Sequence, residues 1–154
     1  DQVVDDIVSE ALRHIDRKSA EHHITVDCGD VPLLVRVDAG LIMQVLINLV
    51  NNAVKYTPAG SNIRITAIPR ENMAEICVSD NGPGIPDELK EHVFEMFFTG
   101  GNPIGDSRRS LGLGLTLCQA IIHAHHGKMT LKDNSPHGCI FSFTVPLSEV
   151  NLNE

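Results

Sequence analysis

The sequence is short of basic residues: 12 Lys and Arg stand against 20 Asp and Glu, which gives a net charge of −8. Proteins that bind nucleic acids normally carry a basic surface, so this class is disfavoured. The four cysteines, Cys28, Cys77, Cys118 and Cys139, form no CxxC pair. This spacing is typical of buried thiols in a reducing compartment and argues against disulfides or a zinc site.

Long apolar runs and a signal peptide are also missing. No run approaches the roughly 20 residues that a membrane-spanning helix requires. The first residue is Asp1 rather than methionine, so we expect a piece of a longer protein. The 154 residues, 42% hydrophobic and 21% charged, suit one globular domain with a sizeable core.

Hydrophobic periodicity predicts helices that alternate with paired strands. Helices are expected over residues 3–20, 39–56 and 113–126, with a short one from Pro86 to about Val93. Strands are expected over residues 24–28, 33–37, 63–68, 74–79, 128–132 and 139–145. This alternation predicts an α/β two-layer sandwich with a mixed sheet. We expect one domain over residues 1–147 and a tail at 148–154.

One stripe of the long helix at 39–56 is polar. Asn48, Asn52 and Lys55 recur at helical spacing and lie on a different face from the apolar stripe. Magnesium needs oxygen ligands and takes several of them from phosphates and water, so one amide oxygen from the protein suffices. Lys55 can add a positive charge, and Tyr56 can pack against a base. The alternative is a solvated polar face, for which asparagine is a poor choice because it is a mediocre helix former.

A second polar segment follows the strand at 74–79. Asp80 precedes Gly82-Pro83-Gly84, and an ionised carboxylate can accept a hydrogen bond from an exocyclic amine such as that of adenine. Glycines let the backbone approach a ligand closely. The alternative is an ordinary tight turn after a strand.

A third segment, Ser110–Leu115, is rich in glycine and leucine. Gly112 and Gly114 at the start of a helix would present free N–H groups to an anion, and Arg108 and Arg109 could clamp phosphates. The alternatives are a glycine-rich hinge and a solvated basic pair. Residues 99–110 have almost no apolar content, so we expect a mobile loop there.

The eight histidines suggest no chemistry by themselves. His123 and His126 share a helix face, but no third ligand is evident, so a zinc site is disfavoured. His14 has no acidic neighbour directly after it to act as a base. It is therefore disfavoured as a phosphoacceptor.

Taken in order, these segments resemble the catalytic and ATP-binding domain of sensor histidine kinases, within the wider GHKL group of ATPases. The segments that resemble its N, G1, F, G2 and last glycine boxes are residues 48–56, 80–84, 93–98, 110–115 and 137–141. The resemblance covers about residues 3–147. Among these kinases, the sequence looks most like the KdpD-type potassium-response sensor kinases.

The resemblance implies a Bergerat fold, with about three main helices on a mixed sheet, and an ATP site. Asn52 would coordinate Mg²⁺, and Asn48 would help or contact a phosphate. Asp80 would take the adenine amino group. Residues 96–111 would form a lid over ATP, anchored at its start by Phe94 and Phe97. The ATP-binding set that the resemblance implies is Asn48, Asn52, Lys55, Tyr56, Asp80, Gly82, Gly84, Ile85, Phe94, Arg108, Arg109, Gly112, Leu113 and Gly114.

Three positions depart from the pattern of the group. Ser110 stands where glycine is usual, and Thr99 stands where an arginine often follows the F box, which shifts the phosphate clamp towards Arg108 or Arg109. Cys139 stands where a threonine often reaches adenine through water, so that contact would be lost. The chain also has no phosphoacceptor segment of the His-Glu-x-x-Arg-Thr-Pro type.

The function that we expect is therefore that of a protein-histidine kinase. It would bind Mg-ATP and transfer the γ-phosphoryl group to a histidine on an upstream dimerisation domain. A response regulator would be a further partner. This domain would be cytoplasmic, in a parent protein associated with the membrane. Hydrolysing relatives have glutamate where Asn48 stands, and asparagine cannot act as that base. The alternatives are a GHKL serine kinase of the anti-sigma type and a nucleotide-sensing module without catalysis.

Overall fold

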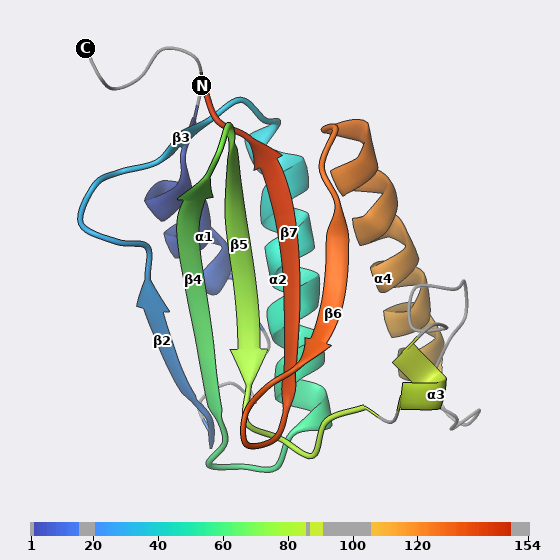
Figure 1. Ribbon diagram of the computed structural model, residues 1–154. Coiled ribbons are helices and arrows are strands. Elements are labelled where there is room, and N and C mark those ends of the chain that lie inside the picture. Colours follow the sequence, from blue (N-terminus) through green and yellow to red (C-terminus); the bar gives the residue numbers. More distant parts are fainter. Residues whose placement is uncertain (1, 16–20, 86, 91–105, 149–154) are drawn as a thin grey trace.

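The computed structural model describes residues 2–15, 21–85, 87–90 and 106–148. Figure 1 shows its helices and strands in chain order. The elements are β1 (Gln2–Val3), α1 (Val4–Leu12), β2 (His23–Asp27), β3 (Leu34–Val35), α2 (Ala39–Tyr56), β4 (Asn62–Arg70), β5 (Met73–Asp80), α3 (Asp87–Lys90), α4 (Asp106–Ala124), β6 (Met129–Asp133) and β7 (Cys139–Pro146).

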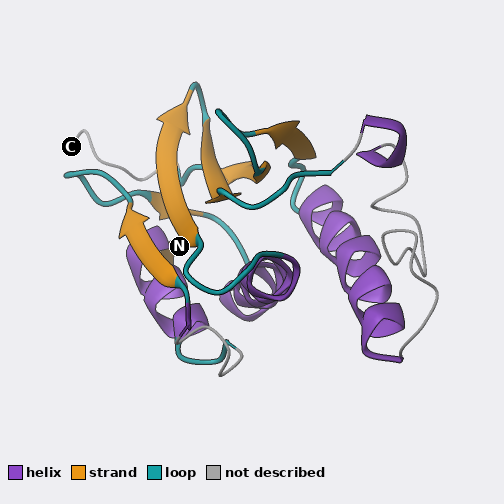
Figure 2. Cartoon of the chain, turned by 90° about the horizontal axis from the view of Figure 1, so that it is seen from below, coloured by secondary structure: helices purple, strands orange, loops and turns teal. Residues whose placement is uncertain are grey.

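A five-stranded sheet in the order β2-β4-β5-β7-β6 forms one layer. Strands β2 and β4 run parallel and the other neighbours are antiparallel, so the sheet is mixed. Helices α1, α2 and α4 lie together on one face of this sheet (Figure 2). The predicted α/β two-layer sandwich is confirmed.

The core between the two layers is aliphatic. Strand β5 alternates: Ala74, Ile76 and Val78 are buried, while the residues between them are partly exposed. Helix α2 faces them with a stripe of fully buried side chains, namely Ile42, Val45, Leu46, Leu49 and Val50. Burying one such side chain contributes roughly 1.5–3 kcal/mol to stability, so α2 is the central helix of the domain.

Helix α2 has the bounds that the sequence predicts. Two hydrogen bonds of Asp38 fix its start. The Asp38 carboxylate caps the helix by accepting a hydrogen bond from the Leu41 N–H at 3.1 Å. The Asp38 N–H in turn donates to Nε2 of His125 at 3.1 Å, and Nδ1 of His125 donates to the Ile121 carbonyl at 2.8 Å. His125 therefore ties the end of α4 to the start of α2.

The helix predicted over residues 113–126 is wrong at both ends, since α4 begins at Asp106 and ends at Ala124. Glycine costs about 1 kcal/mol inside a helix relative to alanine, which weakens a helix without ending it. At the other end, His126 adopts a left-handed φ of 66°. The helix predicted over 3–20 ends at Leu12, and the predicted helix at 86–93 is described only over Asp87–Lys90.

A small second sheet was not predicted. Strands β1 and β3 pair antiparallel, and Val35 also bridges Leu147. The strand predicted over residues 33–37 is present but shorter, as β3, whereas β1 was missed because a strand of two residues carries no readable periodicity. Among the residues that the structure describes, no helix is long and apolar enough to cross a membrane.

Gly127 provides a test of this packing. A Cβ at Gly127 would lie 1.7 Å from the Thr144 carbonyl oxygen on β7. We expect Gly127→Ala to lower the free energy of unfolding by roughly 1–3 kcal/mol, because backbone must move to admit the methyl group. Gly40→Ala is the control, since its Cβ would meet only Asp38 Oδ1 at 3.5 Å. Urea unfolding with equal midpoints for the two variants would contradict the contact.

Candidate functional site

Asn52 lies on the polar stripe of α2 but is buried, with 7% of its surface exposed. Its Oδ1 atom is fully buried and has no hydrogen-bond partner among the described residues. Such an acceptor costs about 1–3 kcal/mol unless something satisfies it. A hard divalent cation such as Mg²⁺ prefers an oxygen ligand of this kind. The geometry of Asn52 therefore fits the metal role that the resemblance implies.

Asn48 lies one turn earlier on α2 and contacts α4. Its Nδ2 donates to the Cys118 Sγ at 3.6 Å, which leaves Oδ1 as the atom available to a ligand. Cys118 is fully buried, and this burial raises the pKa of its thiol to about 11. The thiol therefore stays neutral at physiological pH and places no negative charge beside the polar stripe.

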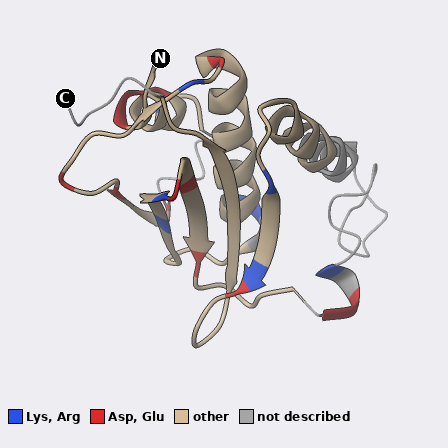
Figure 3. Ribbon diagram, turned by 45° about the horizontal axis from the view of Figure 1, so that its top comes forward, with Lys and Arg blue, Asp and Glu red and all other residues tan. Residues whose placement is uncertain are grey.

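Lys55 is exposed in the last turn of α2. Helix α2 contains no Asp or Glu, and Lys55 is its one charged residue. Acidic and basic residues are scattered over the other elements (Figure 3). The negative charge of the chain therefore lies on residues outside α2. A polyanion such as a nucleotide can approach this helix without repulsion from it.

Asp80 ends β5 and is buried, with 8% of its surface exposed. Its Oδ1 accepts hydrogen bonds from the Gly82 N–H at 3.0 Å and the Cys139 N–H at 3.3 Å. This leaves Oδ2 as the oxygen available to a ligand. Burial raises the pKa of the Asp80 carboxyl above its ordinary value of 3.8, and the two N–H donors partly offset the rise.

The glycines after Asp80 let the backbone turn against its neighbours. A Cβ at Gly82 would lie 2.4 Å from the Thr57 Cγ2, directly after α2. Gly84 adopts a φ of +84°, which side chains rarely tolerate, and Ile85 packs on the core. The end of α2 and the turn at 80–84 therefore touch, so the structure brings together two segments that the sequence singled out separately.

A hollow of about 300 Å³ also borders Asp80. Its walls come from β4, β5 and the neighbouring loops, with Arg64 and Ser79 among them, and include no residue of α2. Arg64 and Thr66, which line it, alternate along β4 with the buried Ile63 and Ile65, so they point to the face of the sheet opposite the core. It therefore adjoins Asp80 without involving the polar stripe of α2.

Comparison with known proteins now decides the family. The family model described as "Histidine kinase-, DNA gyrase B-, and HSP90-like ATPase" matches residues 37–149. The chain belongs to this family. Within it, relatives and solved structures show that the chain is the catalytic, ATP-binding domain of a sensor histidine kinase.

Among curated proteins, the domain is 37% identical over 145 residues to the sensor protein KdpD of Clostridium acetobutylicum, covering 94% of this chain and 16% of KdpD. It is 36% identical over 146 residues to the adaptive-response sensory kinase SasA of Synechocystis, covering 92% of this chain and 37% of SasA. The chain therefore spans only a minor part of the curated relatives that it matches.

Solved structures agree. The catalytic domain of the histidine kinase ThkA superposes with a TM-score of 0.79 at 30% identity, covering 94% of each chain. The mycobacterial sensor histidine kinase MprB has a TM-score of 0.82 at 24% identity, covering 95% of this chain and 97% of that one, and at this identity supports the fold alone.

Several predicted site residues of this histidine kinase domain lie outside the described structure. Phe94, Phe97 and Thr99 fall in the undescribed range 91–105. For Tyr56, Arg108, Arg109, Ser110 and Leu113, the backbone is described as helical but the side chains are not. Their roles remain predictions.

The glycine-rich segment requires a correction. Gly112 and Gly114 lie inside α4 rather than at its start, because the helix begins at Asp106. The N–H groups that a helix start leaves free belong to its first four residues, here 106–109. The prediction that residues 112–114 open the helix is therefore wrong, and residues 106–110, predicted as part of a loop, are helical. Residues 99–105 lie outside the described part.

The structure also adds residues that sequence reasoning missed. Thr57 packs on Gly82, Cys118 contacts Asn48, and Asn134 donates to the Asp80 carbonyl oxygen at 2.8 Å. Cys139, which the sequence suggested only as a lost contact, holds Asp80 through its backbone N–H. The position of Thr57 next to the Asn48–Tyr56 segment was the one available signal, since the other contacts join distant parts of the chain.

In the absence of nucleotide, the ionised Asp80 carboxylate should lower the free energy of unfolding. Because burial raises its pKa above 3.8, the stabilising contribution of the protonated carboxyl is complete below pH 3.8 and is lost as pH rises through the folded-state pKa. We therefore expect Asp80→Asn to raise the free energy of unfolding, least near pH 4 and most at neutral pH. Urea unfolding at several pH values measures this, and equal stability at neutral pH would contradict it.

Proposed function

We propose that this domain binds Mg-ATP between α2 and the Asp80 turn and donates the γ-phosphoryl group to a histidine of a separate dimerisation domain. The observation that carries the proposal is the buried, unpartnered Oδ1 of Asn52. It lies on the same helix whose end packs against the Asp80 turn through Thr57 and Gly82. A metal-binding oxygen and an amine-binding carboxylate on adjoining segments suit the two ends of one nucleotide.

Each described residue then has a role. Asn52 would hold the Mg²⁺ ion, which would neutralise charge on the phosphates. Asp80 would accept the adenine amino group through Oδ2 while the Gly82 and Cys139 N–H groups hold Oδ1 in place. Lys55 would contribute a positive charge to the phosphates, and Ile85 would lie against the base.

The reaction is transfer to a protein side chain rather than hydrolysis. Activation of water needs a base, and the Asn48 amide cannot accept a proton from it. Catalysis would come from positioning and charge stabilisation, as is typical of phosphoryl transfer.

The finer identity is also a proposal. The 37% identity to KdpD supports a KdpD-type sensor kinase that responds to potassium. SasA proteins, one of them 40% identical over 114 residues, support the alternative of a SasA-type kinase. ThkA, 31% identical with a TM-score of 0.74 over 94% of this chain and 40% of that one, has been solved with the response regulator TrrA. We infer a response regulator as a partner here, and a parent protein associated with the membrane.

Two rival functions differ in the acceptor. A serine kinase of the anti-sigma type would phosphorylate a protein hydroxyl, and a sensing module would bind ATP and transfer nothing. The similarity to sensor kinases over 94% of the chain favours histidine as the acceptor. The stability of the phosphorylated product separates the alternatives, because phosphohistidine is labile in acid and phosphoserine is not.

Asp80→Asn tests the adenine contact. We expect the affinity for Mg-ATP to fall more than tenfold, because losing a charged acceptor forfeits about 1.5–3 kcal/mol. Calorimetric titration measures the change. Asp30→Asn, at an exposed position before β3, is the matched control and should bind as wild type does. Equal ATP affinity in the Asp80 variant would remove this residue from the adenine role.

Phosphotransfer tests the whole proposal. We expect labelled ATP to leave the isolated chain unlabelled and to label the dimerisation domain of the same parent when that domain is added. Asn52→Ala should abolish this transfer by removing the metal ligand. Lys55→Ala should reduce it only several-fold, because the lysine is one of several phosphate contacts.

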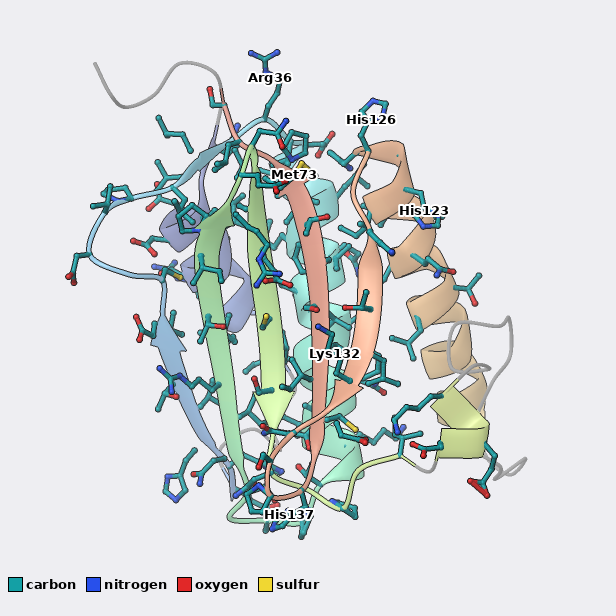
Figure 4. All side chains as sticks on the ribbon, in the orientation of Figure 1. Arg36, Met73, His123, His126, Lys132 and His137 are labelled. Carbon is teal, nitrogen blue, oxygen red and sulfur yellow. The ribbon has the colours of Figure 1, made fainter. Side chains whose placement is uncertain are left out.

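Lys132→Ala, an exposed lysine on β6, is the control for Lys55 and should leave transfer unchanged (Figure 4). Acid-labile phosphate on any histidine of this chain would overturn the assignment of donor and acceptor. Acid-stable phosphate on the added domain would favour the serine kinase.

A further inference from the structure

The Asp80 turn is held by the β6–β7 hairpin. The Asn134 side chain donates to the Asp80 carbonyl oxygen, and the Cys139 N–H donates to the Asp80 carboxylate. Gly138 lies so close that a Cβ there would come within 2.0 Å of the Asp80 carbonyl oxygen. The hairpin therefore fixes where β5 ends and where the Asp80 side chain begins.

His137, in the same hairpin, contacts Gly82, two residues beyond Asp80. Its Nδ1 lies 3.0 Å from the Gly82 carbonyl oxygen. A carbonyl oxygen can only accept a hydrogen bond, so Nδ1 carries the proton and donates. Figure 4 shows His137 at the end of the molecule where β5 finishes and the hairpin turns.

Gly82 is held by hydrogen bonds on both sides of its Cα. Its N–H donates to the Asp80 Oδ1, and its carbonyl accepts from His137. These two groups belong to the two peptide units that flank its Cα, so the two bonds together restrict both backbone torsions of a glycine, the residue with the widest freedom.

The other side of Gly82 is closed by Thr57. The Thr57 methyl group occupies the space where a Cβ of Gly82 would be, 2.4 Å away. The Thr57 hydroxyl donates to the Ala53 carbonyl at 2.7 Å, and Nε2 of His22 lies 2.9 Å from the Thr57 hydroxyl oxygen. Since the hydroxyl proton is used on Ala53, His22 is the donor. The turn is thus held between α2 and the hairpin.

We propose that His137 is a positioning residue for recognition of the 6-amino group of a purine. It keeps Gly82 oriented so that its N–H holds the Asp80 Oδ1, and Oδ2 then faces the amine. The inference rests on the proposed function of the site, and assigns to the β6–β7 hairpin a role in base selectivity. No residue of the hairpin needs to touch the nucleotide through its side chain.

The test compares ATP with ITP, in which an oxygen replaces the 6-amino group. Magnesium complexes of both are titrated into the full chain. For His137→Ala we expect ATP affinity to fall about three- to fivefold, as for loss of one neutral hydrogen bond, and ITP affinity to change less than twofold. For His137→Asn we expect the ATP preference to return to within twofold of wild type, because its amide offers a donor in place of Nδ1.

His123→Ala is the control, an exposed histidine on α4 at the far end of the molecule (Figure 4). An unchanged ratio of ATP to ITP affinity in His137→Ala would overturn the inference. So would an equal loss for both nucleotides, which indicates general damage to the site. A wild-type chain that binds ATP and ITP equally would instead overturn the adenine role of Asp80, and the inference with it.

Amide hydrogen exchange of the nucleotide-free chain gives a second measurement that does not depend on binding. In His137→Ala, the Gly82 N–H should exchange several-fold faster, while the Val78 N–H in the middle of β5 should be unchanged. In His137→Asn, both should exchange as in wild type. Unaltered protection of the Gly82 N–H in the alanine variant would overturn the positioning role of His137.

Discussion

The burial of α2 against the sheet is the constraint on which the rest of the structure depends. Its apolar stripe, from Ile42 to Val50, fixes the rotation of the helix about its axis. That rotation places Asn48 and Asn52 at the border of the core, one against Cys118 of α4 and the other with its oxygen buried. Its C-terminal end then supports the Asp80 turn through Thr57. One packed helix thereby organises both ends of the proposed nucleotide site.

The site is built from groups that the folded chain would be more stable without. The Asn52 Oδ1 is buried without a partner, and Asp80 is a carboxylate whose pKa is raised by burial. The burial of the Asn52 oxygen is not offset by a hydrogen bond, and that of Asp80 is offset only in part by the Gly82 and Cys139 N–H groups, so a cation or an amine would make both favourable. This pattern is typical of binding sites, where stability is lost in exchange for a ready ligand contact.

The sequence predicted most of the secondary structure, and its failures have physical causes. Helix α2 was correct at both ends because an Asp N-cap and a Thr-Pro stop are strong local signals. Helix α4 was wrong because glycine lowers helix stability without forbidding a helix. Strand β1 and its pairing with β3 were missed because a strand of two residues leaves no pattern, although β3 lies inside the strand predicted over residues 33–37. In the proposed site, Asn48, Asn52 and Asp80 were predicted from their residue types and spacing, while the contacts of Cys118, Asn134 and His137 were not.

The sequence by itself determined which chemistry is present: amide oxygens and a lysine on one helix stripe, and a carboxylate before a glycine turn. These follow from local periodicity and side-chain chemistry. Only the tertiary structure decided which atoms are occupied and which are free. Asn48 meets a residue 70 positions away, and Gly82 meets one 55 positions away. Such pairs form only when α4 and the β6–β7 hairpin pack against the same sheet, because contacts across these separations depend on the whole core and not on local sequence.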